Sequence, residues 1–395
     1  MKHPVIILPA AFLLIIIMVT VAVYIPNSLP VGSDFSALYN ADLALVNGIH
    51  VYDIPNMEAL ALSKSNVPAD HFFMPRFPYP PWYMLGTFYL GLLPARIAGA
   101  LWFQLNLVML FLSVWFLTDG WNGRLRLVAF PLALFFLPVL GALSVGQYDF
   151  PVLLGTSLLI YSLRKENIAL TTLGAVLLTF KPHIGALILL SVLGWLIVSR
   201  SNYGRRAMRS TILAGVAMSI ASLIADPLWF INYPKMLLNY QGEGNVTTCS
   251  ECASVPVWTS RWLFDGSLKQ ASVIALILLI TLVFLFWLNR KLIMKSPEVL
   301  VTSALLITLL VSPYLYNYDF ILLLIPFAVL GAFGNIEKIV VILSYLIPSL
   351  AILFYGRGGN ITLNIVTIIL TFLLYWRTWH AGIDFTSPAS YNANN

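Results

Sequence analysis

The sequence predicts an all-α protein that crosses a membrane many times. Three observations indicate this class. First, 59% of the 395 residues are hydrophobic. Second, only 10% are charged, whereas a soluble domain carries about 25% charged residues. Third, the mean hydropathy of the whole chain is +0.87, which leaves little water-soluble mass. We therefore expect residues 1–395 to form a single transmembrane domain.

Twelve apolar segments are candidate membrane spans. Val5–Ile25 is the first, and it is long enough for a bilayer core that needs about 20 residues. It lacks the short apolar core and small-residue cleavage site of a signal peptide, so we interpret it as an uncleaved anchor. The others are residues 97–117, 127–143, 150–163, 168–180, 183–198, 210–226, 271–288, 299–312, 319–333, 339–354 and 362–376.

The distribution of charge supports this topology. With the N-terminus in the cytoplasm, the cytoplasmic segments carry 14 of the 22 Lys and Arg and 5 of the 16 Asp and Glu. Such an excess of cations follows the positive-inside rule. Tyr83–Leu93 is apolar but too short to span, and we predict a re-entrant or interfacial helix there. Residues 26–96 and 227–270 then form long extracytoplasmic loops.

The net charge of +6 has this membrane explanation, so it does not indicate nucleic acid. The chain shows no stripe of Lys and Arg interleaved with aromatic residues, as a nucleic-acid surface would need. We expect membrane lipids, and no nucleic acid, as partners.

The first long loop contains the main candidate for catalysis. Asp34 stands shortly after the first apolar segment and opens a stretch that predicts a short amphipathic helix ending at Gly48. Asp34 or Ser33 would be its N-cap. A carboxylate at the membrane face can also meet a substrate that is part lipid. Capping alone would contribute about 1 kcal/mol, but it does not explain the other polar turns on the same side.

Those outward turns supply the other candidate site residues. Lys181, Arg76 and Arg357 are candidates for binding a lipid phosphate, the alternative being ordinary interfacial cations. The candidates for contacting a sugar or acceptor, some of which could instead only cap helices, are Gln147, Tyr148, Asp149, His183, Asn317 and Asp319. The outer side of a bacterial plasma membrane has no ATP or nucleotide sugar. An enzyme there would need a lipid-linked donor.

The sequence predicts neither a metal nor a cofactor. His50, His71 and His183 lack the spacing of metal ligands, and no Asp-x-Asp motif is present to hold a metal for a nucleotide donor. Cys249 and Cys252 are the two cysteines of the chain. In an oxidising compartment we expect them to form a local disulfide, with a redox-active pair as the alternative.

Several short motifs resemble glycosyltransferase family 87, which belongs to the GT-C superfamily and includes mycobacterial mannosyltransferases. The resemblance runs from about Pro4 to about Pro326. It is carried, in order, by Ser33-Asp34-Phe35 with Tyr39, Ala41, Leu45, Gly48 and Tyr52, then Tyr79-Pro80-Pro81, Gly146-Gln147, Lys181-Pro182 and Ser312-Pro313. Members often have histidine near the segment that reads Tyr316-Asn317-Tyr318-Asp319 here. This chain has none there.

The resemblance implies a GT-C type helical bundle and transfer of a hexose, first of all mannose, from polyprenyl phosphate to a lipid- or glycan-linked acceptor. Asp34 matches the aspartate to which the family's base role is assigned, and transfer would proceed with inversion. Two alternatives remain open. A transporter or lipid flippase commonly shows an internal repeat, and the Asp34 loop is not repeated in the second half. A lipid-linked glycan polymerase or ligase would use a different donor.

Overall fold

The computed structural model describes residues 33–64, 74, 76–240, 252–332 and 334–380. Within these ranges the chain forms helices and no strand. The elements are α2 Ser33–Val46, α3 Ile54–Lys64, α4 Trp82–Leu85, η2 Phe88–Leu92, α5 Ala95–Leu117, α6 Gly123–Leu134, α7 Leu137–Val145, α8 Asp149–Lys165, α9 Ile168–Leu178, α10 Pro182–Ser199, α11 Asn202–Ala221, η3 Ser222–Ile224, α12 Trp229–Tyr240, α13 Val255–Leu263, α14 Leu268–Leu288, α15 Arg290–Ile293, α16 Pro297–Val311, η4 Asn317–Leu323, α17 Leu324–Gly331, α18 Asn335–Tyr355, η5 Gly356–Asn360 and α19 Ile361–His380.

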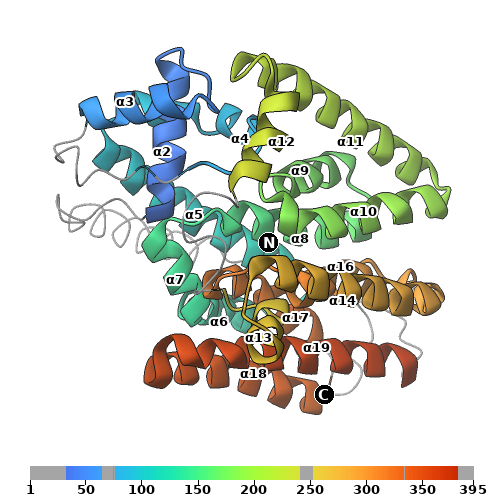
Figure 1. Ribbon diagram of the computed structural model, residues 1–395. Coiled ribbons are helices and arrows are strands. Elements are labelled where there is room, and N and C mark those ends of the chain that lie inside the picture. The colour runs from blue at the N-terminus through green and yellow to red at the C-terminus, as the bar shows by residue number, and fades with distance from the viewer. Residues whose placement is uncertain (1–32, 65–73, 75, 241–251, 333, 381–395) are drawn as a thin grey trace.

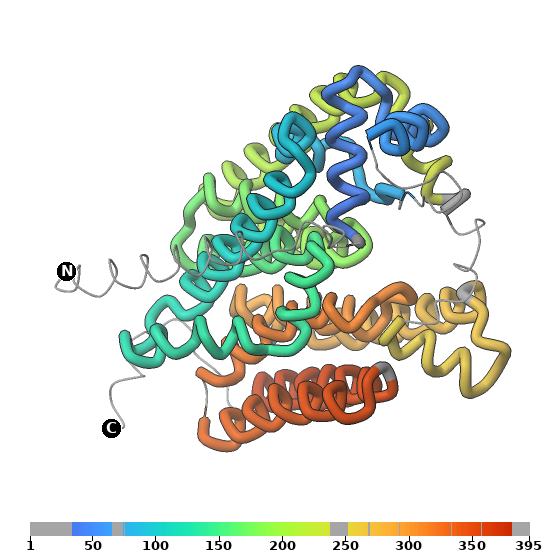
Figure 2. The backbone as a smooth tube through the Cα atoms, turned by 90° about the vertical axis from the view of Figure 1, so that its left-hand side faces the viewer, coloured from blue at the N-terminus to red at the C-terminus, as the bar shows by residue number. Residues whose placement is uncertain are grey.

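The helices are arranged in layers (Figures 1 and 2). The helix pair α18 and α19 forms the lowest layer in both views, and α14, α16 and α17 lie above it. Helix α8 packs against α5 and α9 and also touches α16. Helices α2 and α3 lie in the upper part of Figure 1, where α2 contacts η2, α4, α5 and α7. The all-helical class predicted from the sequence is confirmed for the described residues.

Six of the described helices are long and apolar enough to cross a membrane. They are α5, α10, α11 with η3, α14, α18 and α19 with η5. The pair α6 and α7 raises the number to seven if it counts as one broken span, bent by 56°. The sequence predicted a single helix over 127–143. Pro138 lies in the first turn of α7, where its missing N–H costs no hydrogen bond, whereas this residue could not continue the hydrogen bonding of α6.

Four of the predicted spans are short helices in the structure. They correspond to α8, α9, α16 and η4 with α17. Helix α9 has 11 residues and α16 has 15, so they are about 17 and 23 Å long, less than the roughly 30 Å of a bilayer core. Every residue of α16 from Glu298 onward is buried. Protein surrounds most of α8, α16 and η4 with α17, whereas α9 is only partly buried. The apolar character of these helices does not establish that they cross the membrane. The count of twelve spans remains a prediction. Val5–Ile25 lies outside the described residues.

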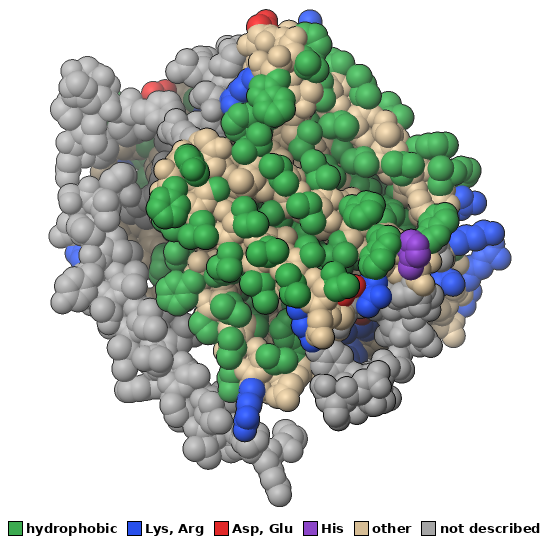
Figure 3. Space-filling view, turned by 90° about the horizontal axis from the view of Figure 1, so that it is seen from below, with side chains coloured by type: hydrophobic (Ala, Val, Ile, Leu, Met, Phe, Trp, Pro, Cys, Tyr) green, Lys and Arg blue, Asp and Glu red, His purple; other side chains and the backbone are tan. Residues whose placement is uncertain are grey.

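The outer face of the helix bundle is strongly apolar. Figure 3 views the molecule from below Figure 1, and hydrophobic side chains cover most of the face seen there. On α18, Leu353 is 68% exposed and Phe354 78%, and Phe372 on α19 is 70% exposed. Apolar patches of this extent mark membrane or protein interfaces. With the long apolar helices, they identify an integral membrane protein.

The helix predicted after Asp34 in the first long loop is present. Helix α2 begins at Ser33, and Gly48 follows its end with a φ of +73°, a left-handed conformation that glycine adopts at little cost. The Tyr83–Leu93 segment forms parts of the short elements α4 and η2, neither of which could cross a membrane. Buried side chains of α2, among them Leu38 and Ala41, pack with Leu90 of η2.

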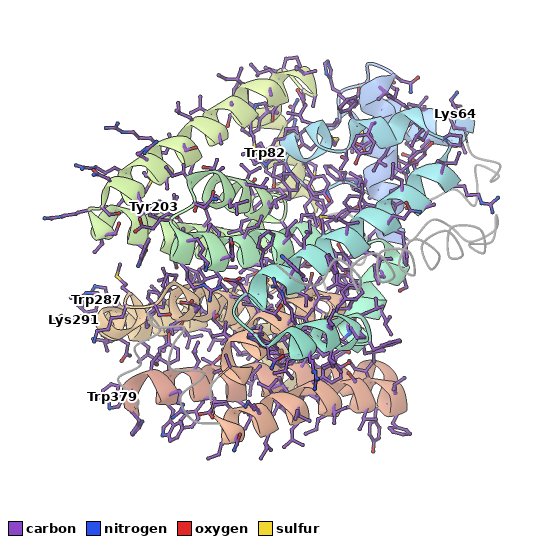
Figure 4. The ribbon with its side chains drawn as sticks, turned by 180° about the vertical axis from the view of Figure 1, so that it is seen from behind. Lys64, Trp82, Tyr203, Trp287, Lys291 and Trp379 are labelled. Atoms are coloured by element: carbon purple, nitrogen blue, oxygen red, sulfur yellow. The ribbon has the colours of Figure 1, made fainter. Side chains whose placement is uncertain are left out.

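The positions of labelled residues show which segments lie at the same end of the helix bundle. Figure 4 shows Trp287, Lys291 and Trp379 at one end of the long helices and Lys64 of α3 near the other. The basic turn after α14 and the end of α19 are therefore on the same side, opposite the first loop. This placement agrees with the charge-based topology. The assignment of that loop to the extracytoplasmic side remains a prediction.

Candidate active site

The candidate site is assembled from four parts of the chain that are far apart in sequence. They are the start of α2, the junction between α7 and α8, the residue before α10, and η4. Figure 1 shows the lower end of α2 against α7, and α7 and α8 both contact η4. This packing brings together Asp34, Gln147, Tyr148, Asp149, Lys181 and Asp319, all of which the sequence nominated.

Asp34 is held by contacts from the α7–α8 junction. The Gln147 side chain donates a hydrogen bond from Nε2 to Asp34 Oδ2 at 2.8 Å, and its Oε1 accepts one from the Tyr148 backbone N–H. The Tyr148 hydroxyl donates to the backbone carbonyl of Asp34 and accepts from the N–H of Leu38 at 3.1 Å. Asp34 lies in the first turn of α2, and its carboxylate is directed to Gln147. It is thus a fixed group at the start of the helix.

Gly146 allows α7 to end directly against α2. Its φ of +70° makes it the left-handed C-cap of α7, a position that favours glycine. A Cβ atom on Gly146 would stand 2.6 Å from Cβ of Phe35. The residue next to Asp34 therefore packs where only glycine leaves room. In addition, the Trp102 indole N–H donates to the Gly146 carbonyl at 2.9 Å.

We expect Gly146→Ala to reduce transfer activity at least about 10-fold, because both the clash with Phe35 and the left-handed backbone displace α2 from Gln147. Gly194→Ala is the matched control, since a Cβ at Gly194 in α10 meets nothing within 4 Å. Turnover and thermal stability of both variants provide the check. Equal activity in the two would show that the α7–α2 contact does not position Asp34.

Lys181 lies in a buried ionic cluster behind Asp34. Its ammonium donates to Asp149 Oδ1 at 2.8 Å and also to Asp319 Oδ1. The second oxygen of Asp319 accepts a hydrogen bond from the Tyr316 backbone N–H at 2.6 Å. One cation thus joins the start of α8 to η4. Its exposed fraction is only 3%, so burial makes each partner depend on the other two.

Tyr318 connects this cluster to Asp34. Its hydroxyl acts on the Asp34 carboxyl group and lowers the pKa of that group, and the Lys181 ammonium lies 5.6 Å from the centre of its ring. Gln147, Asp149, Lys181 and Asp319 are all buried, whereas Asp34, Asn317 and Tyr318 are half-exposed. Asp34 is therefore the one carboxylate of the three in this cluster that a ligand can reach.

The surroundings make Asp34 a better base than an exposed carboxylate. Burial raises its pKa above the ordinary value of 3.8, and the nearby Asp319 carboxylate acts in the same direction. Lys181 and the Tyr318 hydrogen bond oppose this rise without cancelling it. A carboxylate with a raised pKa takes up a proton more readily, as general-base catalysis requires.

The comparison with protein families decides which family the protein belongs to. The model of glycosyltransferase family 87 matches residues 77–313, more than half of the chain. The chain belongs to glycosyltransferase family 87. Comparison with curated proteins and with solved structures found no match. The membership predicted from the motifs is confirmed, and it favours a transferase over a transporter. The matched region of this family 87 protein includes Gln147, Asp149 and Lys181. It does not include Asp34 or Asp319.

The structure separates the remaining predicted residues of the family 87 enzyme. His183 is exposed, and its ring centre lies 6.4 Å from that of Tyr314. Arg76 is half-exposed and precedes the buried Phe77, which packs at 6.3 Å from the ring of Tyr148. Arg357 lies in η5 between α18 and α19, outside the four segments that form the site. The structure thus brings Arg76 close to the site and leaves Arg357 apart.

The sequence analysis did not identify Tyr318 as a site residue, and it did not predict the structural role of Tyr148. The signal for the first is the alternation of tyrosines at positions 314, 316 and 318 immediately before Asp319. Tyr148, expected to contact a sugar, is 2% exposed and instead anchors α2 through its hydroxyl. Its burial leaves no surface for a sugar in this structure.

The metal and disulfide predictions concern other parts of the molecule. Within the described ranges, no group of three or more His, Cys, Asp or Glu side chains is placed to hold a metal ion. Cys252 is disulfide-bonded. Its predicted partner, Cys249, lies outside the described residues.

Proposed function

We propose that this family 87 glycosyltransferase transfers a hexose from polyprenyl phosphate to a lipid- or glycan-linked acceptor on the extracytoplasmic face. Mannose is the first candidate for the hexose. The observation that carries the proposal is the half-exposed carboxylate of Asp34. It is held by Gln147 at 2.8 Å and stands in front of a buried ionic cluster. Its position in a helix of the first loop, next to the membrane-spanning bundle, suits a donor whose polyprenyl chain stays in the bilayer.

In the proposed reaction Asp34 removes the proton from an acceptor hydroxyl as that oxygen attacks the anomeric carbon of the donor sugar. The bond between this carbon and the phosphate oxygen breaks, and polyprenyl phosphate leaves with the electron pair. Attack from the side opposite the phosphate inverts the anomeric configuration. A positioned base contributes about 10²–10⁴ in rate, and positioning of the two substrates supplies a further large part.

The contacts of Lys181 suggest different roles for Lys181 and Arg76. Lys181 is already bonded to Asp149 and Asp319, and the three carboxylates outnumber this one ammonium. A phosphate at Lys181 would have to displace a buried carboxylate. We therefore assign Lys181 to positioning Asp319 and its neighbour Tyr318, rather than to the phosphate contact expected from the sequence. The half-exposed Arg76 is the better candidate for holding the phosphate of the donor.

The test is a donor screen with purified protein in lipid nanodiscs. The protein is incubated with polyprenyl-phosphate mannose, glucose or galactose together with short glycoside acceptors, and released polyprenyl phosphate is quantified. We expect acceptor-dependent release with at least one donor, and product of inverted configuration by NMR. Release with none of these donors, alongside transfer from a lipid-pyrophosphate oligosaccharide, would replace the proposal with a glycan ligase.

The pH dependence of the rate follows from the raised pKa of Asp34. Transfer requires the unprotonated carboxylate, so the rate should fall as pH decreases through this pKa. The fall should begin at a higher pH than for a carboxyl group with the ordinary pKa of 3.8. Initial rates at saturating donor, measured across the acidic range with stability monitored in parallel, give the profile. A rate that stays constant until the protein unfolds would contradict the assignment of Asp34 as base.

A further inference from the structure

We propose that Tyr314, Tyr316 and Tyr318 form a subsite for the acceptor saccharide and guide its reactive hydroxyl to Asp34. This inference rests on the proposed function, and it specifies which part of the site receives the acceptor. The three residues, called the tyrosine row below, lie in the turn between α16 and η4 and at the start of η4.

The rings of the tyrosine row form a continuous series that ends at the base. Tyr314 and Tyr316 meet edge to face with ring centres 5.4 Å apart. Tyr316 and Tyr318 are stacked at 5.1 Å with an angle of 18° between their planes. At the far end, His183 lies 6.4 Å from Tyr314. At the near end, the ring centre of Tyr318 lies 5.6 Å from the Lys181 ammonium behind Asp34, and its hydroxyl acts on the Asp34 carboxyl group. The distance between neighbouring ring centres is comparable with the length of one pyranose residue.

The tyrosine row is supported from behind. Tyr314 and Tyr316 pack on the buried side chains of Cys252, Val257 and Ala271. The backbone N–H of Ala253 donates to the carbonyl of Leu315, between the two rings, at 2.6 Å. The backbone of Tyr316 is held by Asp319, which Lys181 holds in turn. These contacts fix the rings before any ligand arrives, which reduces the entropy lost on binding.

Exposure distinguishes the tyrosine row from the rest of the site. Tyr314, Tyr316 and Tyr318 are half-exposed, while Gln147, Tyr148, Asp149, Lys181 and Asp319 are buried. A tyrosine combines an apolar ring with a hydroxyl that donates and accepts hydrogen bonds. A sugar has the complementary surface, with C–H groups on one face and hydroxyls at the edge. The row therefore offers the accessible groups that suit a saccharide.

The end of the row at Asp34 identifies the acceptor as the ligand. The base must touch the hydroxyl that it deprotonates, and that hydroxyl belongs to the acceptor. A sugar at the exposed edge of Tyr318 would present its hydroxyl to Asp34, and preceding sugars of the same chain would lie along Tyr316, Tyr314 and His183. The phosphate of the donor would instead avoid this end, because the ammonium of Lys181 is already bonded to two carboxylates there and Asp34 adds a third negative charge.

The test measures binding of octyl mannosides with one, two and three sugars, and of the glucoside series, to protein in lipid nanodiscs. With the parent we expect affinity to rise with sugar number in at least one series. Tyr316→Ala and Tyr314→Ala should weaken the trisaccharide at least about 10-fold, raise the KM for this acceptor, and leave the KM for the donor unchanged. Tyr316→Trp should retain the affinity, because it restores an aromatic ring.

Tyr355→Ala is the matched control, since Tyr355 at the end of α18 is 77% exposed and lies outside the row. Three outcomes would overturn the inference: no binding of either series by the parent, unchanged affinity in both row variants, or an equal loss in the control. Donor-dependent release of polyprenyl phosphate in the same preparations tests the proposed function separately. A protein that transfers sugar but shows unaltered acceptor binding in Tyr316→Ala would retain the function and lose the subsite.

Discussion

Asp34→Asn is expected to lower the transfer rate at least about 100-fold while leaving folding and donor binding close to those of the parent. The amide keeps the size of the side chain and still has an oxygen that can accept the bond from Gln147 Nε2. It cannot take a proton from the acceptor. Turnover, donor affinity and melting temperature measured on one preparation distinguish a base from a structural residue.

Asp53→Asn provides the control for this substitution. Asp53 lies in the same loop, and its carboxylate accepts a hydrogen bond from the Asn56 side chain at 2.7 Å, outside the site. Its variant should keep full activity. An active Asp34→Asn would exclude the base role, and poor expression of Asp34→Ala beside it would indicate a structural role instead.

Lys181→Ala is expected to destabilise the protein strongly, by about 3–5 kcal/mol. The substitution leaves Asp149 and Asp319 buried without their cation, and each of these residues is at most 1% exposed. The variant should show a lower melting temperature and little transfer. Lys181→Arg should recover part of the stability, because it keeps the charge although its geometry differs. Thermal unfolding in nanodiscs, followed together with turnover, measures both effects.

The controls for Lys181 separate burial from charge. Lys165→Ala removes a lysine that is 52% exposed and lies 3.3 Å from Asp119, so it should cost only about 0–1 kcal/mol. A triple variant with Lys181→Met, Asp149→Asn and Asp319→Asn removes the buried charges together and should recover most of the stability without the activity. If Lys181→Ala instead leaves stability unchanged and weakens only donor binding, Lys181 contacts the donor phosphate after all.

The sequence was informative about which residues matter and less so about what they contact. The order of polar turns and the charge of the intervening segments placed Asp34, Gln147, Asp149, Lys181 and Asp319 on one side, and the structure brings these five together. The pairing of Lys181 with both carboxylates could not be predicted. Its partners lie 32 and 138 residues away, and the choice between a phosphate and a carboxylate depends on packing that composition does not encode.

The prediction of membrane-spanning helices from hydropathy was limited in a similar way. Hydropathy located a helix in each predicted segment that the structure describes, because apolar runs favour helix whether lipid or protein surrounds them. It did not distinguish α14, whose surface is largely exposed, from α16, which is buried throughout. Length is the better indicator, since 15 residues do not reach across a bilayer core of about 30 Å. Exposure in the tyrosine row was likewise unpredictable, as tyrosine occurs in cores and on surfaces alike.

The ionic cluster also has a consequence for how the protein is made. During synthesis, Asp149 and Lys181 emerge only 32 residues apart, at the beginnings of α8 and α10. They can neutralise each other as soon as these two helices pack together. Asp319 emerges 138 residues after Lys181, when α11 to α16 have already been made. The pair formed first is therefore balanced in charge, and the second carboxylate that Lys181 binds is added only when η4 joins the assembled helices.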